Sequence, residues 1–299
     1  MKSLKIFCLS LVFPGLLLSC ENAKGSNSGD DGKTKKEQKN NKTKEVASSA
    51  VEVVKKWDLP EILLEVSGIT YLGNNQFACV QDEDGVIFIY DTAANKIERS
   101  ITFGAAGDYE GIAVVGRTAY VVRSDGKIYE VDNLDTKSPK VTEHATPLTA
   151  ANNVEGLTYD AKQNRLLLAI KGAEAGSQTY KGVYAFNLST KKMAAQPLFK
   201  IDLNDTNLKN NAGKKLNNAL QPSELAVHPQ NGNIYLTEGA NPQLFIISPA
   251  GKILARHKLD DQVFNQPEGI TFSPAGEMYI SNEGKKTPGN ILQVRLKSE

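Results

Sequence analysis

Three glutamates stand at the same place in copies of one short motif. They are Glu110, Glu155 and Glu268, each followed by glycine and an apolar residue, and Ser67 and Ser223 take the equivalent place in two further copies. Carboxylates brought close together repel one another unless protons or a cation join them. Oxygen ligands without matching Cys or His favour a hard ion such as Ca²⁺. The motif therefore predicts a Ca²⁺ site formed by the three glutamates, with the two serines lining it and binding through water.

The spacing of the motif indicates the elements that must position these residues. Its copies follow one another at steps of 43, 45, 68 and 45 residues, and a period of this size is typical of propellers and solenoids. Between copies, short segments rich in Val, Ile, Tyr and Phe alternate with Gly, Asn and Asp turns, and no stretch has a sustained helical period. Each of the first four repeats offers four strands, of which the motif strand is the first. We predict an all-β, five-bladed β-propeller.

Two segments bear on the number of blades and on the closure of the ring. The 68-residue step contains Asn204 to Gln221, a polar insertion that we interpret as a loop; counting it as a blade gives the alternative of six. The fifth repeat has only three strands, and a missing fourth would expose a sheet edge. Val51 to Leu59 resembles the outer strands of other repeats, so we expect this N-terminal strand to close the ring.

The motif strand is predicted to be innermost, which directs its first residue to the central channel. The ends of second strands also approach the channel mouth, which adds Asp82, Glu238 and Asn282 as possible channel-lining residues, together with Glu83 and Glu283. Lys171, at the matching place in the third repeat, could pair with a motif glutamate and would then weaken the metal interpretation. Alternatively, the glutamates only accept backbone N–H bonds in a tight loop. The motif glycines are predicted to permit close contact between blades.

The N-terminus has the pattern of a secretory signal. Two lysines precede the apolar run Ile6 to Leu18, which ends in Leu-Leu-Ser-Cys at Cys20; the run is shorter than the roughly 20 residues of a transmembrane helix. This ending resembles the lipobox of bacterial lipoproteins, which implies a signal peptide over 1–19 and lipidation of Cys20. An ordinary signal peptide that happens to end in cysteine is the alternative. Residues 20–50, polar and lysine-rich, are predicted to be a disordered tether, and 51–299 the propeller domain.

Composition restricts the remaining possibilities. The net charge of +1 argues against a nucleic-acid partner. Within 51–299 the single cysteine, Cys79, excludes an intramolecular disulfide and is predicted to be a buried apolar residue. The three histidines, His144, His228 and His257, are not placed beside a nucleophile, and no P-loop, HExxH or EF-hand spacing is present.

The motifs taken together and in order resemble a known family. They read SGITY from Ser67, GDYEGIA from Gly107, NVEGLTYD from Asn153, PSELA from Pro222 and QPEGITF from Gln266. Over residues 57–296 the chain is similar to the SdiA-regulated (YjiK-like) proteins, distant relatives of the NHL-repeat propellers. The resemblance implies a five-bladed propeller with a calcium ion on its inner face. The chain differs from the family pattern at Arg123-Ser124, in place of an acidic pair, and at Ser223-Glu224, in place of Ser-Gly.

These observations lead to one expected function and two alternatives. We expect a monomeric, non-enzymatic calcium-binding propeller that interacts with a protein or small-molecule ligand. Its lipid anchor would hold it at the bacterial cell membrane or outer membrane, facing the periplasm or the cell exterior. The first alternative is a calcium-dependent lactonase or related hydrolase that uses the same carboxylates. The second is a structural scaffold with an empty channel.

Overall fold

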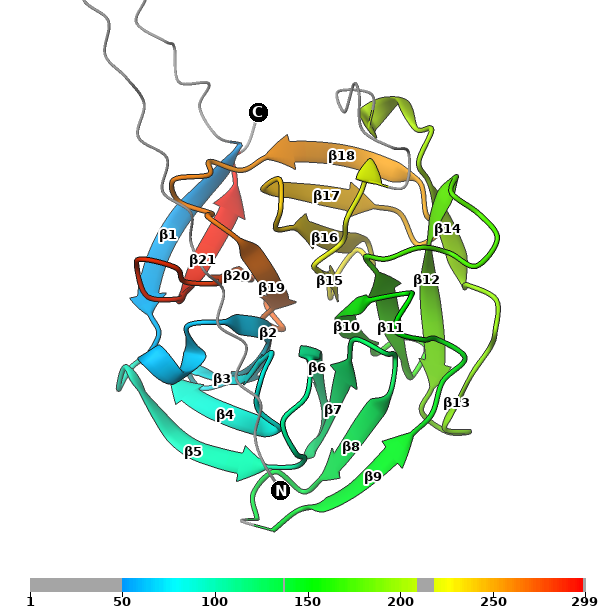
Figure 1. The fold of residues 1–299 in the computed structure, drawn as a ribbon. Helices are drawn as coiled ribbons and strands as arrows, with labels where there is room; N and C mark the ends of the chain where they lie inside the picture. The colour runs from blue at the N-terminus through cyan, green and yellow to red at the C-terminus, as the bar shows by residue number, and fades with distance from the viewer. Residues whose placement is uncertain (1–49, 137, 209–217, 298–299) are drawn as a thin grey trace, which may run out of the picture. The chain divides into compact units, whose positions relative to one another are not determined.

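The computed structural model describes residues 50–136, 138–208 and 218–297 (Figure 1). These residues belong to one compact unit, Ala47–Glu299. The predicted signal peptide, Cys20 and almost all of the predicted tether lie outside the described residues, so their assignments stay predictions. Within the described part of the chain, no helix is long and apolar enough to cross a membrane.

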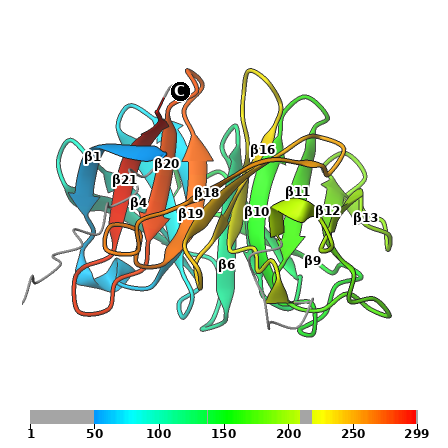
Figure 2. The same ribbon diagram turned by 90° about the horizontal axis from the view of Figure 1, so that it is seen from above.

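Five antiparallel sheets form the blades of a propeller, with their strands arranged around a common centre (Figures 1 and 2). From the channel outward, the strands of blade one are β2 (Val66–Gly73), β3 (Gln76–Gln81), β4 (Val86–Asp91) and β5 (Lys96–Thr102). Those of blade two are β6 (Tyr109–Val115), β7 (Thr118–Arg123), β8 (Ile128–Asp132) and β9 (Lys140–His144). The five-bladed prediction is confirmed, and the six-bladed alternative is wrong.

The remaining blades follow the same order with two variations. Blade three contains β10 (Val154–Asp160), β11 (Arg165–Ile170) and β12 (Tyr180–Asn187), whose outer edge pairs with two short strands, β13 (Lys192–Met193) and β14 (Phe199–Asp202). Blade four consists of β15 (Glu224–Val227), β16 (Ile234–Glu238), β17 (Gln243–Ile247) and β18 (Ile253–Lys258). Blade five takes β19 (Pro267–Phe272), β20 (Met278–Asn282) and β21 (Asn290–Leu296) from the end of the chain, and β1 (Val51–Asp58) from its beginning.

The pairing of β1 with β21 closes the ring. The two strands are antiparallel, with Val51 opposite Leu296 and Asp58 opposite Asn290. The backbone N–H of Leu59 extends the pairing with a 2.7 Å bond to the carbonyl of Gly289. The predicted closure by an N-terminal strand is confirmed.

The apolar pattern of the strands explains why the blades pack side by side. In β4, Ile87 and Ile89 point into the cluster between blades one and two, whereas Phe88 and Tyr90 point into the cluster between blades five and one. Successive side chains of a strand alternate between faces, so a strand that is apolar at every position can fill two cores. Five such clusters lie between neighbouring blades and include Cys79, which is free and buried as expected.

The motif glycines allow the innermost strands to approach closely. A Cβ atom on Gly111 would lie 2.8 Å from the Cβ of Leu157 and 2.9 Å from its backbone nitrogen, in the next blade. A Cβ on Gly68 would lie 2.9 Å from the carbonyl oxygen of Glu110. All three distances are too short for a Cβ atom, so the glycine of the motif sets the spacing of the blades around the channel.

The insertion before blade four does more than connect strands. Its described residues contain the 3-10 turn η2 (Thr206–Leu208), while 209–217 are outside the described residues. Leu208, Ala219 and Leu220 are buried in the core between blades three and four. The described ends of the insertion contain no strand, as expected of a loop, but their apolar residues complete a core.

Candidate functional site

The innermost strands open into an acidic cavity at one end of the channel. The cavity measures about 150 Å³, and blades one, two, three and five contribute its lining. Glu110 from β6, Glu155 from β10 and Glu268 from β19 all line it. The same register in three blades therefore brings the three motif glutamates to one place. Their role as metal ligands stays a prediction.

Burial and mutual repulsion both favour the neutral forms of these glutamates. Burial raises the pKa of Glu110 to about 10, and the charges of Glu155, Asp108 and Glu268 act in the same direction. Burial likewise raises the pKa of Glu268 to about 8; the charge of Glu155 adds to this, while Lys171 opposes it. A cation in the cavity would stabilise the charged forms instead.

Lys171 is the basic residue that lines this cavity. It follows the end of β11, and its Nζ lies 3.0 Å from Oε2 of Glu155. Glu155 also accepts a 2.6 Å bond from Nδ2 of Asn153. Burial still raises the pKa of Glu155, although Lys171 and Asn153 act against that shift. The expectation that Lys171 could pair with a motif glutamate is confirmed.

A second acidic group lies at the rim of the cavity. Glu65, Asp82 and Glu283 all line it, from blades one and five. Burial raises the pKa of Asp82 to about 6, and the charges of Glu65 and Glu83 contribute. Within the described residues, Oδ1 of Asp82 is buried and has no hydrogen-bond partner. An unpaired buried oxygen next to other carboxylates is a position at which a cation or an ordered water would be stabilising.

The other residues predicted to line the channel divide into two groups. Ser67 lines the cavity, and its hydroxyl donates a 2.7 Å bond to the carbonyl of Tyr109. Ser223, Glu238 and Asn282 are buried but are not among the residues that line the cavity. Ser223 accepts the N–H of Gly239, and Glu238 and Asn282 bond with Gln243 and Asn290. Ser223 also hydrogen-bonds to the carboxylate of Glu268, which lines the cavity, whereas Glu238 and Asn282 support the fold of blades four and five.

Glu224 is a carboxylate that the sequence reasoning did not assign to the site. It stands where the other motif copies carry glycine, and it is fully buried. Its Oε1 accepts N–H bonds from Leu157 and Leu225 at 2.5 and 2.8 Å, whereas no described residue bonds to Oε2. Burial raises its pKa well above the ordinary value, and the charges of Glu110 and Glu155 add to the shift. In the sequence, the only sign of this buried carboxylate was that Glu224 replaces the glycine of the other motif copies.

Glu65 and Gln266 were also missed, and a simple pattern could have found them. Each lies two residues before a motif position, and both line the cavity. The same offset in the other copies gives Asp108, Asn153 and Gln221, which are also polar. All five residues precede the innermost strands, and Glu65 and Gln266 are the two of them that line the cavity.

The residues present fit a hard cation in their chemistry but do not form a finished coordination shell. The donors are oxygen atoms, as Ca²⁺ prefers. Within the described residues, however, no three His, Cys, Asp or Glu side chains are grouped so that they could hold a metal ion. The ion pair between Lys171 and Glu155 occupies one of the donors. Water and backbone carbonyls would have to supply part of a six- to eight-fold shell.

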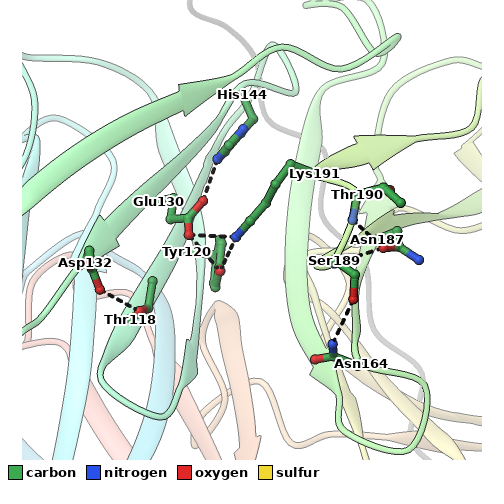
Figure 3. Close-up of polar contacts among 10 residues, drawn as sticks. All are labelled: Thr118, Tyr120, Glu130, Asp132, His144, Asn164, Asn187, Ser189, Thr190 and Lys191. Carbon is green, nitrogen blue, oxygen red and sulfur yellow. Dashed lines mark hydrogen bonds and ion pairs between the residues drawn. The ribbon is translucent and has the colours of Figure 1, made fainter.

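A second cavity and a polar cluster lie outside the acidic cavity. The second cavity, about 190 Å³ between blades three and four, contains one carboxylate, Asp160, which already pairs with Arg165 at 2.9 Å. The cluster joins blades two and three (Figure 3): Glu130 accepts bonds from Nζ of Lys191 and pairs with Nε2 of His144, both at 2.6 Å. The members of this cluster satisfy one another and line neither cavity, so we interpret it as a structural tie.

The chain is similar to known proteins in its fold. No family model matches the sequence, and neither does any curated protein. The glutaminyl cyclase of Myxococcus xanthus aligns with a TM-score of 0.56 and 16% identity over 83% of this chain and 96% of that chain. A protein of unknown function from Bacteroides thetaiotaomicron VPI-5482 aligns with a TM-score of 0.51 and 14% identity, over 82% and 76%. The PQQ-bound aldose sugar dehydrogenase of Streptomyces coelicolor aligns with a TM-score of 0.50 and 13% identity, over 83% of this chain and 98% of that chain. At such identities the likeness concerns the fold alone, and this chain is a β-propeller similar in architecture to these proteins.

Proposed function

We propose that this protein is a cation-binding propeller of the bacterial cell envelope, with Ca²⁺ as its ion. The observation that supports this most is the cavity at the channel end, which is lined by six carboxylates and one ammonium group. Glu155 is buried, and burial also raises the pKa values of Glu110 and Glu268, so these three carboxylates are destabilising when they are charged without a counter-charge. A divalent ion offsets more of the repulsion than the single ammonium group can.

Glu110, Glu155 and Glu268 would hold the ion after their side chains had moved closer together than they lie in this structure, and Asp82 would take part through its unpaired Oδ1. The bound ion would supply positive charge at a place where the loops of several blades meet. By binding side chains from several blades, the ion would align these loops, so a calcium-loaded channel end would present a fixed surface to a protein or small-molecule ligand.

We further propose that the protein acts as a monomer. We also propose that it belongs to the SdiA-regulated family, on the strength of its five motifs.

Elemental analysis and calcium-dependent thermal shift test the proposal. The purified protein is expected to contain calcium, and Ca²⁺ added after chelation should raise its Tm. Glu110→Gln should lose most of this shift, whereas the exposed Glu61→Gln should keep it. Absence of both the metal and the shift in the wild-type protein would refute calcium binding and leave a scaffold. Turnover of a lactone panel that disappears in Glu110→Gln would instead identify the metal-dependent hydrolase.

We also propose that a lipid on Cys20 anchors the protein to a membrane. The proposal rests on the position of Cys20 after an apolar run and a small residue. Metabolic labelling with a fatty acid should mark the wild-type protein, which should partition into detergent, whereas Cys20→Ser should remain unlabelled. Labelling of neither protein would contradict the anchor without touching the calcium proposal.

A further inference from the structure

We propose that Lys171 is a tethered competitor for the cavity, so that an entering cation must displace its ammonium group from Glu155. This inference rests on the proposed cation binding and concerns what controls it. Lys171 lines the cavity, and its Nζ lies 3.0 Å from Oε2 of Glu155. The side chain of Glu155 is only 6% exposed. The ammonium group thus occupies one of the most enclosed carboxylates that the cavity offers.

The register of the strands shows that Lys171 departs from its equivalents in other blades. The last residues of β3, β11 and β20 pair with Val66, Val154 and Pro267, each one residue before a motif position. The residues that follow these strands are therefore equivalent, and they are Asp82, Lys171 and Glu283 in blades one, three and five. All three line the cavity. Two of these equivalent positions add negative charge to the cavity, and the third carries a cation into it.

The backbone of Lys171 is held in place, which leaves the side chain as the part that can move. Its N–H donates a 2.9 Å bond to the carbonyl of Asn153. Its carbonyl accepts a 2.5 Å bond from Nζ of Lys181, a residue that is 1% exposed and that also bonds to the carbonyl of Gly172. The buried Lys181 thus positions the start of the loop after β11. Displacement of Lys171 then requires rotation of a flexible side chain and no rearrangement of the sheet.

Competition from a tethered group lowers the apparent affinity for an external ion. If Ca²⁺ binds only when the ammonium group has left, the apparent dissociation constant rises by the reciprocal of the fraction of protein in that state. An ion pair that is formed in nine-tenths of the molecules or more weakens binding by about tenfold or more. Monovalent ions carry no more charge than the ammonium group they would replace. Competition by the Lys171 ammonium group therefore favours divalent cations over Na⁺ and K⁺.

Calcium titration of the purified full-length protein in detergent, by isothermal calorimetry, tests the inference. Lys171→Met removes the competitor and should bind Ca²⁺ about tenfold or more tightly than the wild type. Lys171→Arg keeps the charge and should change affinity little. Lys285→Met is the matched control, because the substitution makes the same change in net charge as Lys171→Met. Lys285 is exposed in the loop after β20 and does not line the cavity. It should shift the affinity by about twofold at most.

The outcomes separate this inference from the proposed function. Equal or weaker binding by Lys171→Met, with normal binding by the wild type, overturns the competitor role while calcium binding stands. No binding by the wild type or any variant overturns both. Should Lys171→Met fold poorly, acylation of lysines in the wild-type protein gives an independent measurement by mass spectrometry. Modification of Lys171 should increase at saturating Ca²⁺, and an unchanged or reduced modification overturns the inference.

Discussion

Replacement of Glu268 by Gln should stabilise the calcium-free propeller, and the gain should increase with pH. Burial raises the pKa of Glu268 from 4.5 to about 8 in the folded protein. A group with a raised folded-state pKa contributes stability that is fully present below its unfolded pKa and is lost as pH rises through the folded value. The wild type therefore loses this contribution between about pH 4.5 and pH 8, whereas the neutral glutamine has none to lose.

The size of this difference in stability follows from the raised pKa of Glu268. One pKa unit corresponds to about 1.4 kcal/mol, so the stability gap between Glu268→Gln and the wild type should widen by about 3 kcal/mol from pH 5 to pH 8. For a domain of this size, 1 kcal/mol changes Tm by about 2–4 °C, which makes the expected difference about 6–12 °C. Thermal unfolding in EDTA at both pH values measures it. Added Ca²⁺ should narrow the gap at pH 8 by neutralising the wild-type carboxylates.

A control variant distinguishes this effect from a general change in charge. Glu61 is exposed on the 3-10 turn η1 (Glu61–Leu63), outside the cavity, and Glu61→Gln should follow the wild type at both pH values. A gap between Glu268→Gln and the wild type that stays constant or shrinks toward pH 8 would refute the reasoning. It would show that Glu268 is charged and well stabilised in the folded protein.

Three further predictions concern the fold. Gly111→Ala should destabilise the propeller by about 1–3 kcal/mol in urea unfolding, because the added Cβ meets Leu157 at 2.8 Å; an unchanged midpoint would contradict the close contact. Leu220→Ala should cost about 2–5 kcal/mol, because this side chain is fully buried between blades three and four, and a loss below that range would mean that the insertion contributes little to the core. Deletion of Val51–Asp58 should abolish cooperative melting, as followed by circular dichroism, because the deletion exposes β21; a retained sharp transition would refute closure by this strand.

The fold was predictable because its determinants are local and repeated. The motif recurs in every blade, and the expected Asn turns are represented by Asn74 and Asn75 between β2 and β3, both at positive φ, 49° and 65°. Closure by β1 was also predictable, because a fifth repeat without an outer strand leaves an unpaired edge. The six-bladed alternative arose from the insertion at 204–221, whose apolar residues are too few for a strand but complete a neighbouring core.

The site was less predictable, because its properties depend on packing between blades. The register brought Glu110, Glu155 and Glu268 together, but no sequence pattern shows that Ser223 lies behind Glu268, bonded to its carboxylate and to the N–H of Gly239, and does not line the cavity itself. The burial of Glu224 depends on the backbone of blade three, whose Leu157 N–H it accepts. Such contacts join residues that lie far apart in the sequence, and a single sequence carries no record of them.

The pairing of β1 with β21 has a mechanical consequence. The chain that precedes Ala50 joins the propeller at the outermost strand of blade five. Backbone bonds on one edge and the exposed ion pair between Arg295 and Glu52 hold this strand to its sheet, and Val51 and Trp57 pack into the neighbouring cores. If the proposed lipid anchor is present, tension transmitted from it would act first on the pairing of β1 with β21. The resistance of this pairing to pulling, more than the melting temperature of the ring, would set how much force the anchored protein withstands.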